Sequence, residues 1–505
     1  MSPSFNLIEA PWIPCVTAEG DIIELGLADV LVNAHNLREI ADPSPLVVAA
    51  LYRLTLAILH RVFGPRGLST WGELWDAGHW PREPLEQYLN QWYDRFDLFH
   101  PQRPFFQTED SRVRPKSVIN LVHSSSNNPT LFSHETEEEA VALTSAQAAR
   151  ELLAAQAFHV AGLSGLTDQK FTDAPCARGV VYLAQGQSLF ETLALNLIRY
   201  PERSGRYIRT TDNDRPAWEM DDPFVPSRTL PLGYLDYLTW HTLRVVLLPE
   251  PSSDGILVRQ VTIGPGMQLD ADLHDPMKLY QVDKKGQGFK VVRLSEDRAL
   301  WRNAHTLLAL HSDLSSPPAS VNWLSELVDE GYLSLETRMR YMALGMNSYQ
   351  AKVFFYRQEH MPIRLAYLQR QELVGHLARA ISLSEDAARS LNWALKTLAR
   401  LLIAPASDQS GSRQPDDKRD VQPLVKQWGV TRHYWGDVEP LFWRLVESLP
   451  DDPEQALALW KDQLWDAAHR AFAHAEELAG PAPAALKAAV EARRRLYNGL
   501  RKALQ

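Results

Sequence analysis

The spacing of hydrophobic positions changes along the chain, and it predicts helices in some regions and strands in others. Residues 46–63 are apolar at helical spacing and predict a buried helix, and residues 84–96 predict an amphipathic helix that begins at a proline. Between about 240 and 295, runs rich in β-branched residues are separated by Gly, Pro and Asp. These runs predict short strands: HTLRVVLLPE, ILVRQVTIG, KLYQVDKK and FKVVRL. A turn or hairpin is expected at Gly345–Gln350.

From about Ile363 onward the pattern is almost entirely helical. The helical stretches are RLAYLQRQELVGHLARAIS, SEDAARSLNWALKTLARLLI, RHYWGDVEPLFWRLVESL and a last part running from PEQALALW to LRKAL. The polar segment SDQSGSRQPDDKRD separates the second stretch from the third, and GPAPA divides the last part into two candidate helices. Antiparallel packing is the default for such a set.

Composition is typical of a globular protein, with 45% hydrophobic and 23% charged residues in a chain of 505. That length predicts two or three domains. The two cysteines, Cys15 and Cys176, are too few for a disulfide scaffold and are expected to be buried. The N-terminus lacks the pattern of a signal peptide, and no uncharged apolar run approaches 18 residues. We therefore expect a cytoplasmic protein without a membrane partner.

The formal net charge of −10 argues against a protein that coats nucleic acid, but the charge is unevenly distributed. Residues 485–505 carry six basic residues against one acid, and residues 278–302 carry seven against three. Such patches suit nucleic-acid contacts in a protein that gains affinity from partners. Ordinary solvated helix and strand faces explain them equally well.

Motifs that would indicate catalysis are missing. The chain has no GxxxxGK[ST] loop, no HExxH, no CxxC and no GxSxG. The His274–Asp275 pair lacks further ligands at matching positions and is interpreted as structural. We assign no catalytic residue, no metal and no cofactor, and expect a protein that is not an enzyme, although scattered acidic residues could still assemble a site.

Several segments occur together in a characteristic order: FNLIEAPWIP, RFDLFHPQRPFFQ, SSNNPTLF, SEDRALWRN and RHYWGDVEPLFW. In this order they resemble the CasA family, the large subunit of the type I-E CRISPR surveillance complex Cascade, over essentially the whole chain. The resemblance implies an α+β fold, with a mixed α/β domain carrying small β-hairpins at residues 1–363 and a C-terminal four-helix bundle at residues 364–505. The helical boundary near Ile363 agrees with this.

The resemblance also implies a function. Guide RNA reads the target sequence by base pairing, while the protein checks a short adjacent motif, the PAM, and helps to open the duplex. The implied partners are the guide RNA (crRNA), the double-stranded DNA target, the backbone and small subunits of Cascade, and a separate helicase-nuclease that the chain would recruit. In this family the PAM check resembles reading of the minor groove, whose code is degenerate.

Three groups of residues match PAM-contacting features of the family. The first is the glycine loop of Gly162, Leu163, Ser164 and Gly165, since glycine lets backbone approach a DNA groove closely. The second is Arg259, matched to a basic residue on a hairpin that enters the minor groove. The third is the wedge Gln350 with its neighbours Tyr349 and Ala351, which would force base pairs apart. A plain turn or a solvated strand residue is the competing interpretation at each position.

Other positions are matched to less specific contacts. Lys284 and Lys285 are alternative candidates to Arg259 and would contact phosphate. Asn128 and Phe132 would contact the 5′ handle of the guide RNA, with Leu131 as the alternative to Phe132. A basic end of the bundle would contact DNA without sequence preference; it comprises Arg493, Arg494, Arg495 and Lys502.

Two other classes of function stay open. A nuclease or other hydrolase with a scattered site would cleave DNA in a metal-dependent way as the purified chain. A purely structural adaptor would support assembly of its complex without affecting PAM preference.

Overall fold

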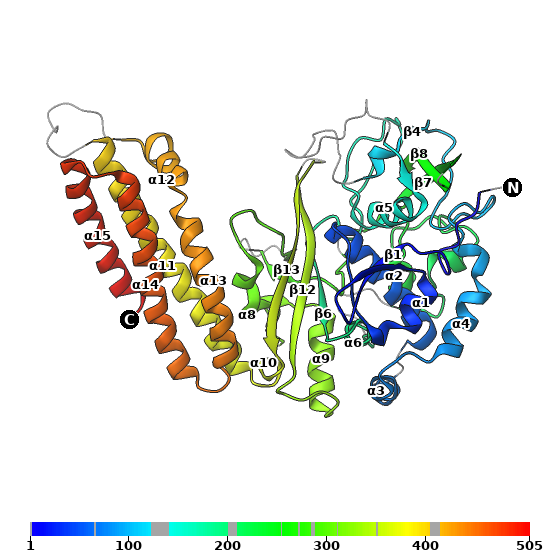
Figure 1. The fold of residues 1–505 in the computed structure, drawn as a ribbon, viewed down its shortest axis with the longest axis horizontal. Helices are drawn as coiled ribbons and strands as arrows, with labels where there is room; N and C mark the ends of the chain where they lie inside the picture. Colours follow the sequence, from blue (N-terminus) through cyan, green and yellow to red (C-terminus); the bar gives the residue numbers. More distant parts are fainter. Residues whose placement is uncertain are drawn as a thin grey trace. The chain divides into compact units, whose positions relative to one another are not determined.

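The computed structural model describes residues 3–64, 67–122, 141–199, 210–253, 255–270, 273–283, 288–310, 312–349, 352–404 and 415–505. The chain divides into two units. The first, here called the mixed unit, comprises Met1–Leu300 and Leu310–Met361; the second, the helical unit, comprises Trp301–Ala309 and Pro362–Gln505. Helices and sheets occur together, as expected for the α+β class (Figure 1).

The mixed unit is organised around one buried helix, α2 (Pro45–Phe63), which is apolar on nearly all sides. Its length and composition would suit a membrane span, but 83% of its most apolar window is buried inside the protein, so core packing accounts for its composition. The other helices of this unit are α1 (Leu27–Val32), α3 (Leu68–Ala77), α4 (Arg82–Gln91), α5 (Ser145–Phe158), α6 (Leu189–Leu195), α7 (Tyr234–Leu238) and α9 (Ala319–Asp329).

Small sheets surround these helices. The first contains β1 (Ile13–Thr17) between β2 (Ile22–Leu25) and β3 (Leu37–Ile40). In the second, β8 (Gly255–Pro265) pairs with β7 (Leu243–Ser252), β4 (Lys116–Ser117) and β5 (Leu143–Thr144). The third has β9 (Tyr280–Val282) between β10 (Phe289–Val291) and β11 (Ser315–Ser316). The fourth has the order β13 (Lys352–Arg364), β12 (Arg338–Tyr349) and β6 (Val180–Gln185).

The strand predictions between 240 and 295 are confirmed by β7, β8, β9 and β10. The turn or hairpin expected at Gly345–Gln350 does not begin at Gly345. β12 continues to Tyr349, and Gly345 sits within the strand opposite Val180 of β6. The pairing with β6 keeps this segment extended, although glycine, asparagine and serine favour a turn locally.

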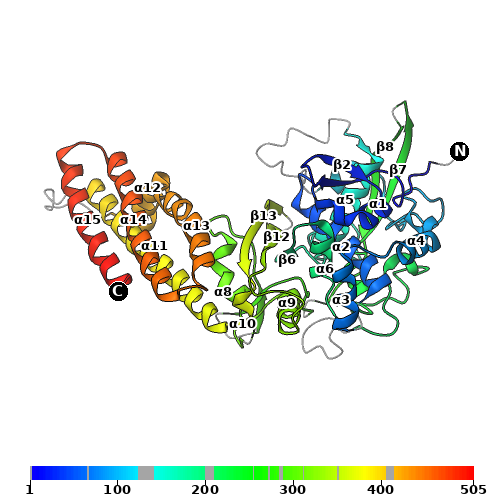
Figure 2. The same ribbon diagram turned by 60° about the horizontal axis from the view of Figure 1, so that its bottom comes forward.

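In the described part of the helical unit, four long helices run side by side, as Figures 1 and 2 show. These are α11 (Gln371–Ile403), α13 (Val430–Ser448), α14 (Pro453–Ala479) and α15 (Pro483–Ala503), with the shorter α8 (Ala304–Leu307), α10 (Ala366–Gln369) and α12 (Gln422–Trp428). The first predicted stretch begins with the end of β13 and α10, and its remainder from Gln371 joins the second stretch in one helix, α11, because no helix-breaking residue separates them. The last predicted part is two helices, and α14 ends at Gly480, whose φ is +83°.

Buried side chains with polar ends fix how these helices pack. The Trp460 indole on α14 donates a hydrogen bond to the Ala380 carbonyl on α11 (2.9 Å). The Tyr434 hydroxyl on α13 donates to the Ser384 carbonyl, also on α11 (2.9 Å). Each of these rings is buried, so the hydrogen bonds satisfy groups that would otherwise lie unpaired in the core.

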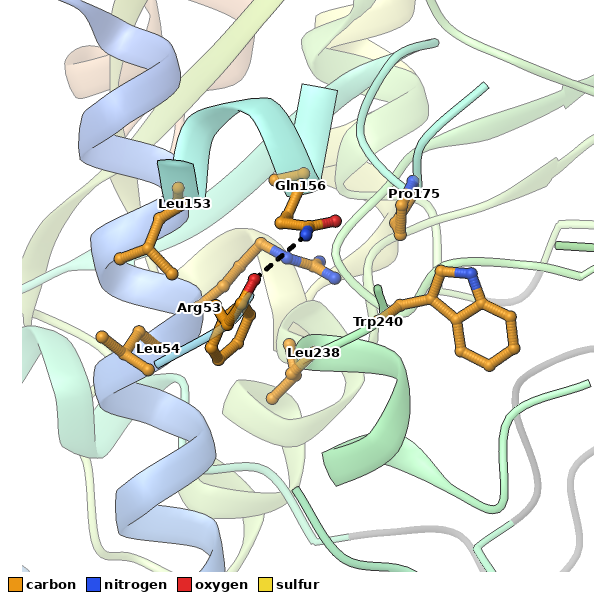
Figure 3. Close-up of a pocket in the computed structure, with 10 residues that line it drawn as sticks. Arg53, Leu54, Leu153, Gln156, Pro175, Leu238 and Trp240 are labelled. Carbon is orange, nitrogen blue, oxygen red and sulfur yellow. Dashed lines mark hydrogen bonds between the residues drawn. The ribbon is translucent and has the colours of Figure 1, made fainter. Parts of the chain in front are cut away.

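Charged residues are buried at the centre of the mixed unit. Arg53 of α2 is 2% exposed, and its guanidinium lies 3.7 Å from the Asp275 carboxylate. Lys278 lies 3.6 Å from the same carboxylate, which also accepts a hydrogen bond from the Tyr237 hydroxyl (2.8 Å). Figure 3 shows Arg53 extending from α2 past Gln156 of α5, beside a cavity of about 20 Å³.

Candidate nucleic-acid interface

The predicted glycine loop is a closed loop held by backbone hydrogen bonds. Gly162 and Phe171 exchange two backbone hydrogen bonds of 3.2 and 3.1 Å, which join the two ends of the loop. Within it, the Ser164 hydroxyl donates to the Gln169 carbonyl and accepts from the Leu166 N–H. Gly165 has a φ of +81°, a conformation that favours glycine. Leu163 is 85% exposed at the loop surface, so this ordered loop presents an apolar side chain to solvent.

Side chains on both sides tie this loop to the rest of the mixed unit. The Ala161 N–H donates to the Asp173 carboxylate (2.8 Å), and the Gln169 amide donates to the Gly266 carbonyl after β8 (3.2 Å). Arg112 forms an ion pair with Asp168 of the loop (3.1 Å). These contacts hold the loop in a defined position on the surface of the mixed unit.

The predicted wedge residues fall in the sequence between β12 and β13, which are neighbours in one sheet. The end of β12 is anchored on two neighbouring segments: the Asn347 amide donates to the Leu294 carbonyl (2.7 Å), and the Ser348 hydroxyl donates to the Ala177 carbonyl (3.5 Å). Tyr349 is the last residue of β12, and its side chain lies outside the described part of the structure. Gln350 and Ala351 also lie outside it.

A cavity of about 1080 Å³ lies between the start of the glycine loop and the segments that anchor β12. Ala161, which precedes Gly162, lines the cavity on one side. Arg178 and Arg293, which are the chain neighbours of Ala177 and Leu294, line it on the other. The structure thus brings the segment before the glycine loop and the segments that anchor the end of β12 to one cavity.

Positive charge lines this cavity. Arg178 pairs with Asp173, Lys290 pairs with Asp283 (2.9 Å), and the buried Lys278 pairs with Asp275. Arg293 differs, because none of the described residues forms a hydrogen bond or an ion pair with its guanidinium. Burial and the nearby charge of Arg178 lower the pKa of Arg293, only partly opposed by Asp173. An anion in the cavity would offset this repulsion.

Arg259 does not join this cluster. It lies on β8, where its guanidinium is 3.4 Å from the Glu250 carboxylate of β7, and it is partly exposed. Arg259 and Gly266, where the glycine loop is anchored, are seven positions apart in the sequence, a distance of about 20 Å along an extended chain. The structure therefore places Arg259 on the strand that precedes the anchor of the loop, well away from that anchor.

The remaining predicted contacts fall in two places. Asn128, Leu131, Phe132, Lys284 and Lys285 lie outside the described residues. The basic end of the helical unit lies on α15, where Arg493, Arg494, Arg495 and Lys502 are exposed. Of these, Arg493 pairs with Glu476 of α14.

Sequence reasoning did not single out Arg178 or Arg293. Arg293 belongs to the basic excess of residues 278–302, so a signal was present in the charge pattern. Arg178 stands alone in its segment, and only the fold brings it to Arg293 across 115 residues of chain.

Burial shifts the pKa values of several titratable groups in the mixed unit away from their usual ranges. Burial lowers the pKa of His60 and of His241 to about 3, so both rings are neutral. Burial also raises the pKa of the Cys15 thiol to about 12, which keeps it protonated. Within the described ranges, no three His, Cys, Asp or Glu side chains cluster in a way that could hold a metal ion.

Comparison with known proteins gives consistent matches over nearly the whole chain. A family model described as CRISPR-associated protein Cse1 matches residues 6–471. The CRISPR-associated protein CasA/Cse1 of Thermus thermophilus is 36% identical over 500 residues, covering 96% of this chain and 95% of that protein. The crystal structure of Thermus thermophilus CasA superimposes with a TM-score of 0.81 at 32% identity, covering 99% of both chains. A chain in a solved CRISPR RNA-guided surveillance complex has the same fold, with a TM-score of 0.74 at 22% identity, covering 98% of this chain and all of that one.

Proposed function

The chain belongs to the CRISPR-associated Cse1 family, also named CasA, and we propose that it is the large subunit of a type I-E Cascade complex in the cytoplasm. In this role it recognises the PAM in double-stranded DNA and helps to open the duplex for pairing with the guide RNA. It then recruits the helicase-nuclease and performs no chemistry itself. The chain of the same fold in an RNA-guided surveillance complex supports this assembly.

One observation carries the proposal for DNA. Ala161, directly before the glycine loop, lines the same cavity as Arg178 and Arg293, which are the chain neighbours of the residues that anchor the end of β12. A duplex lying over this cavity would meet the backbone of the loop in its groove and the hairpin tip at its end. The wedge residues Tyr349, Gln350 and Ala351 would then separate base pairs while arginines neutralise phosphates.

The same proposal includes contacts with the guide RNA, with DNA phosphates and with the other subunits. Asn128 and Phe132, with Leu131 as the alternative, hold the handle of the guide RNA, and Lys284 and Lys285 contact phosphate. The helical unit acts as a four-helix bundle of residues 364–505 that docks on the other Cascade subunits. Its exposed cations Arg494, Arg495 and Lys502 contact DNA without sequence preference. Arg493 contributes less there, because Glu476 already neutralises it.

The test is gel-shift binding of a matched duplex target by the reconstituted RNA-guided complex across a PAM library at fixed salt. The complex is prepared with the wild-type chain, without it, with Gln350→Ala and with Gln87→Ala, an exposed glutamine on α4 that serves as the matched control. We expect PAM-dependent binding that needs the chain, weakens about tenfold or more in Gln350→Ala, and is unchanged in Gln87→Ala.

Binding that ignores both the PAM and the chain would refute the proposal. If the complex needs the chain for assembly but its PAM preference is the same without the chain, the chain is an adaptor. Metal-dependent cleavage of DNA by the purified chain would indicate a nuclease.

A further inference from the structure

The cavity beside the glycine loop also has features of a binding site for an unpaired base. This inference rests on the proposed function and extends it. If the hairpin tip opens the duplex, the bases next to it lose their stacking partners and need another environment. A cavity lies close to the end of β12, because Asn347 and Ser348 donate hydrogen bonds to the Leu294 and Ala177 carbonyls, and the chain neighbours of these residues, Arg293 and Arg178, line that cavity.

The cavity combines cationic side chains with an aromatic wall. His274 and Tyr280 stack with their ring centroids 4.0 Å apart and an angle of 2° between the planes. Phe289 meets the His274 ring edge-on at 6.0 Å, and all three rings line the cavity. Aromatic faces bind unpaired bases without regard to their identity, and arginines bind phosphate through paired N–H groups.

The cavity also has a suitable size. Its volume of about 1080 Å³ reaches the upper end of the range found for small-molecule sites, roughly 300–1,000 Å³. A single nucleotide would fit, whereas an intact duplex is too wide to enter and would stay at the rim.

The cavity is held in shape by the surrounding strands. Gly179 follows Arg178 with a φ of +88°, and a side chain on it would collide with Val291 of β10. Lys278 donates to the Pro175 carbonyl (2.5 Å) and so fixes the segment before Arg178 from inside the core. Arg178 therefore projects from a rigid turn, which lowers the entropy lost on binding.

We propose that this cavity binds one nucleotide of a DNA strand released from the duplex beside the hairpin, with its phosphate between Arg178 and Arg293 and its base against His274 and Phe289. A bound phosphate would stabilise the charge of Arg293 most, because this residue forms no ion pair with any of the described residues. Arg178 would share the phosphate while it keeps its ion pair with Asp173.

A chemical double-mutant cycle tests this in the reconstituted complex. Single phosphates on each DNA strand near the PAM are replaced, one at a time, by uncharged methylphosphonates, and the Kd of each duplex is measured with wild type, Arg293→Gln and Arg82→Gln. Arg82 is an exposed arginine on α4, paired with Glu86, and its variant is the control with the same charge change. In wild type, we expect one position to weaken binding about tenfold.

With Arg293→Gln, the unmodified duplex should bind about tenfold more weakly, and the sensitive methylphosphonate should have no further effect, because both changes remove the same contact. Arg82→Gln should keep both the wild-type Kd and the sensitive position. The inference is wrong if Arg293→Gln binds DNA with the wild-type Kd. It is also wrong if Arg293→Gln raises the Kd by the same factor for every methylphosphonate duplex, since no phosphate would then be coupled to Arg293.

Two further outcomes separate this inference from the proposed function. If the wild-type complex shows PAM-dependent binding that needs the chain while no phosphate couples to Arg293, the cavity assignment fails and the proposed function stands. If wild-type binding needs neither the PAM nor the chain, both fail. Loss of Arg293→Gln from the RNA-containing complex in the absence of DNA would show that Arg293 acts in assembly of the complex, which would also overturn the inference.

Discussion

Glu151 on α5 is a carboxyl group whose environment favours the protonated form. Burial and the nearby charge of Asp42 raise the pKa of Glu151 to about 7, although Arg150 opposes the shift. Arg150 is already engaged with Asp42 (3.3 Å) and Glu24 (2.6 Å), so it compensates Glu151 only in part. Near neutral pH, folding therefore has to bury a carboxylate that is incompletely paired.

This predicts a pH dependence of stability that can be assigned to one residue. The folded-state pKa is higher than the unfolded one, so the contribution of Glu151 is complete below about pH 4.3 and is lost as the pH rises through about 7. Glu151→Gln should therefore be more stable than wild type at pH 8, by about 2 kcal/mol relative to the difference at pH 5.

The measurement is the free energy of unfolding in denaturant at both pH values. His60 and His241, with lowered pKa values, give wild type an opposite pH dependence at acidic pH, so the difference between variant and wild type is the quantity to compare. A difference that stays constant from pH 5 to pH 8 would contradict the prediction.

At the level of residues, the sequence indicated the local features and not the distant pairs. The turn-forming residues of Gly162–Gly165 predicted a loop, and the structure has one, with Gly165 at a positive φ. The Arg178–Arg293 pair has no local signature, because each arginine is an ordinary polar position in its own segment. They come together only in the folded protein, where both line the same cavity.

At the level of elements, two glycines differ in a way that predicts different effects of the same substitution. Gly165 and Gly179 both have positive φ, +81° and +88°. An added Cβ at Gly165 would point into open space, whereas at Gly179 it would collide with the Val291 side chain on β10. Gly165→Ala thus tests backbone strain alone, and Gly179→Ala adds a steric conflict between the turn before β6 and the neighbouring strand.

We expect Gly165→Ala to lower the free energy of unfolding by about 1 kcal/mol and Gly179→Ala by about 2–4 kcal/mol. Denaturant unfolding of the two purified variants checks this. Equal effects would mean that β10 shifts to make room for the added methyl group, and that this wall of the cavity deforms more easily than its contacts indicate.

Elements were predicted best where one pattern extends over many residues. The β-branched runs between 240 and 295 became strands, and the long apolar periodicities became α2 and the long helices of the helical unit. The end of β12 was misplaced because Gly345, Asn347 and Ser348 favour a turn locally. Their partners in the fold, Val180, Leu294 and Ala177, come from other segments and hold them extended.

At the level of the whole molecule, the division into units does not follow the order of the sequence completely. The change to a helical pattern near Ile363 coincides with the start of the main part of the helical unit at Pro362. Trp301–Ala309 also belongs to that unit, although it lies about fifty residues earlier, between segments of the mixed unit. No hydrophobic pattern in nine residues could assign them, because their environment is made by side chains from α11 and α13.

Trp301 makes this connection testable. It is 1% exposed, and its ring lies 4.3 Å from Phe442 and 5.9 Å from Trp435, both on α13. The adjacent Arg302 lies over the Trp435 ring (3.8 Å) and pairs with Glu385 of α11. Removing a buried tryptophan leaves a large cavity, so Trp301→Ala should destabilise the helical unit by about 3–5 kcal/mol.

Hydrogen exchange resolved along the chain by mass spectrometry distinguishes the two units. In Trp301→Ala, protection should fall in α13 and α14 and stay at its wild-type level in α2, because the substitution acts on the helical unit although residue 301 lies in the middle of the sequence. Trp393→Ala, at a tryptophan that is 59% exposed on α11, should leave both units unchanged. Equal loss in α2 and α13 would show that the two units unfold together. In that case residues 364–505 would not unfold as an independent helical domain. Trp301, which packs on α13, would instead belong to one structure that unfolds cooperatively in both units.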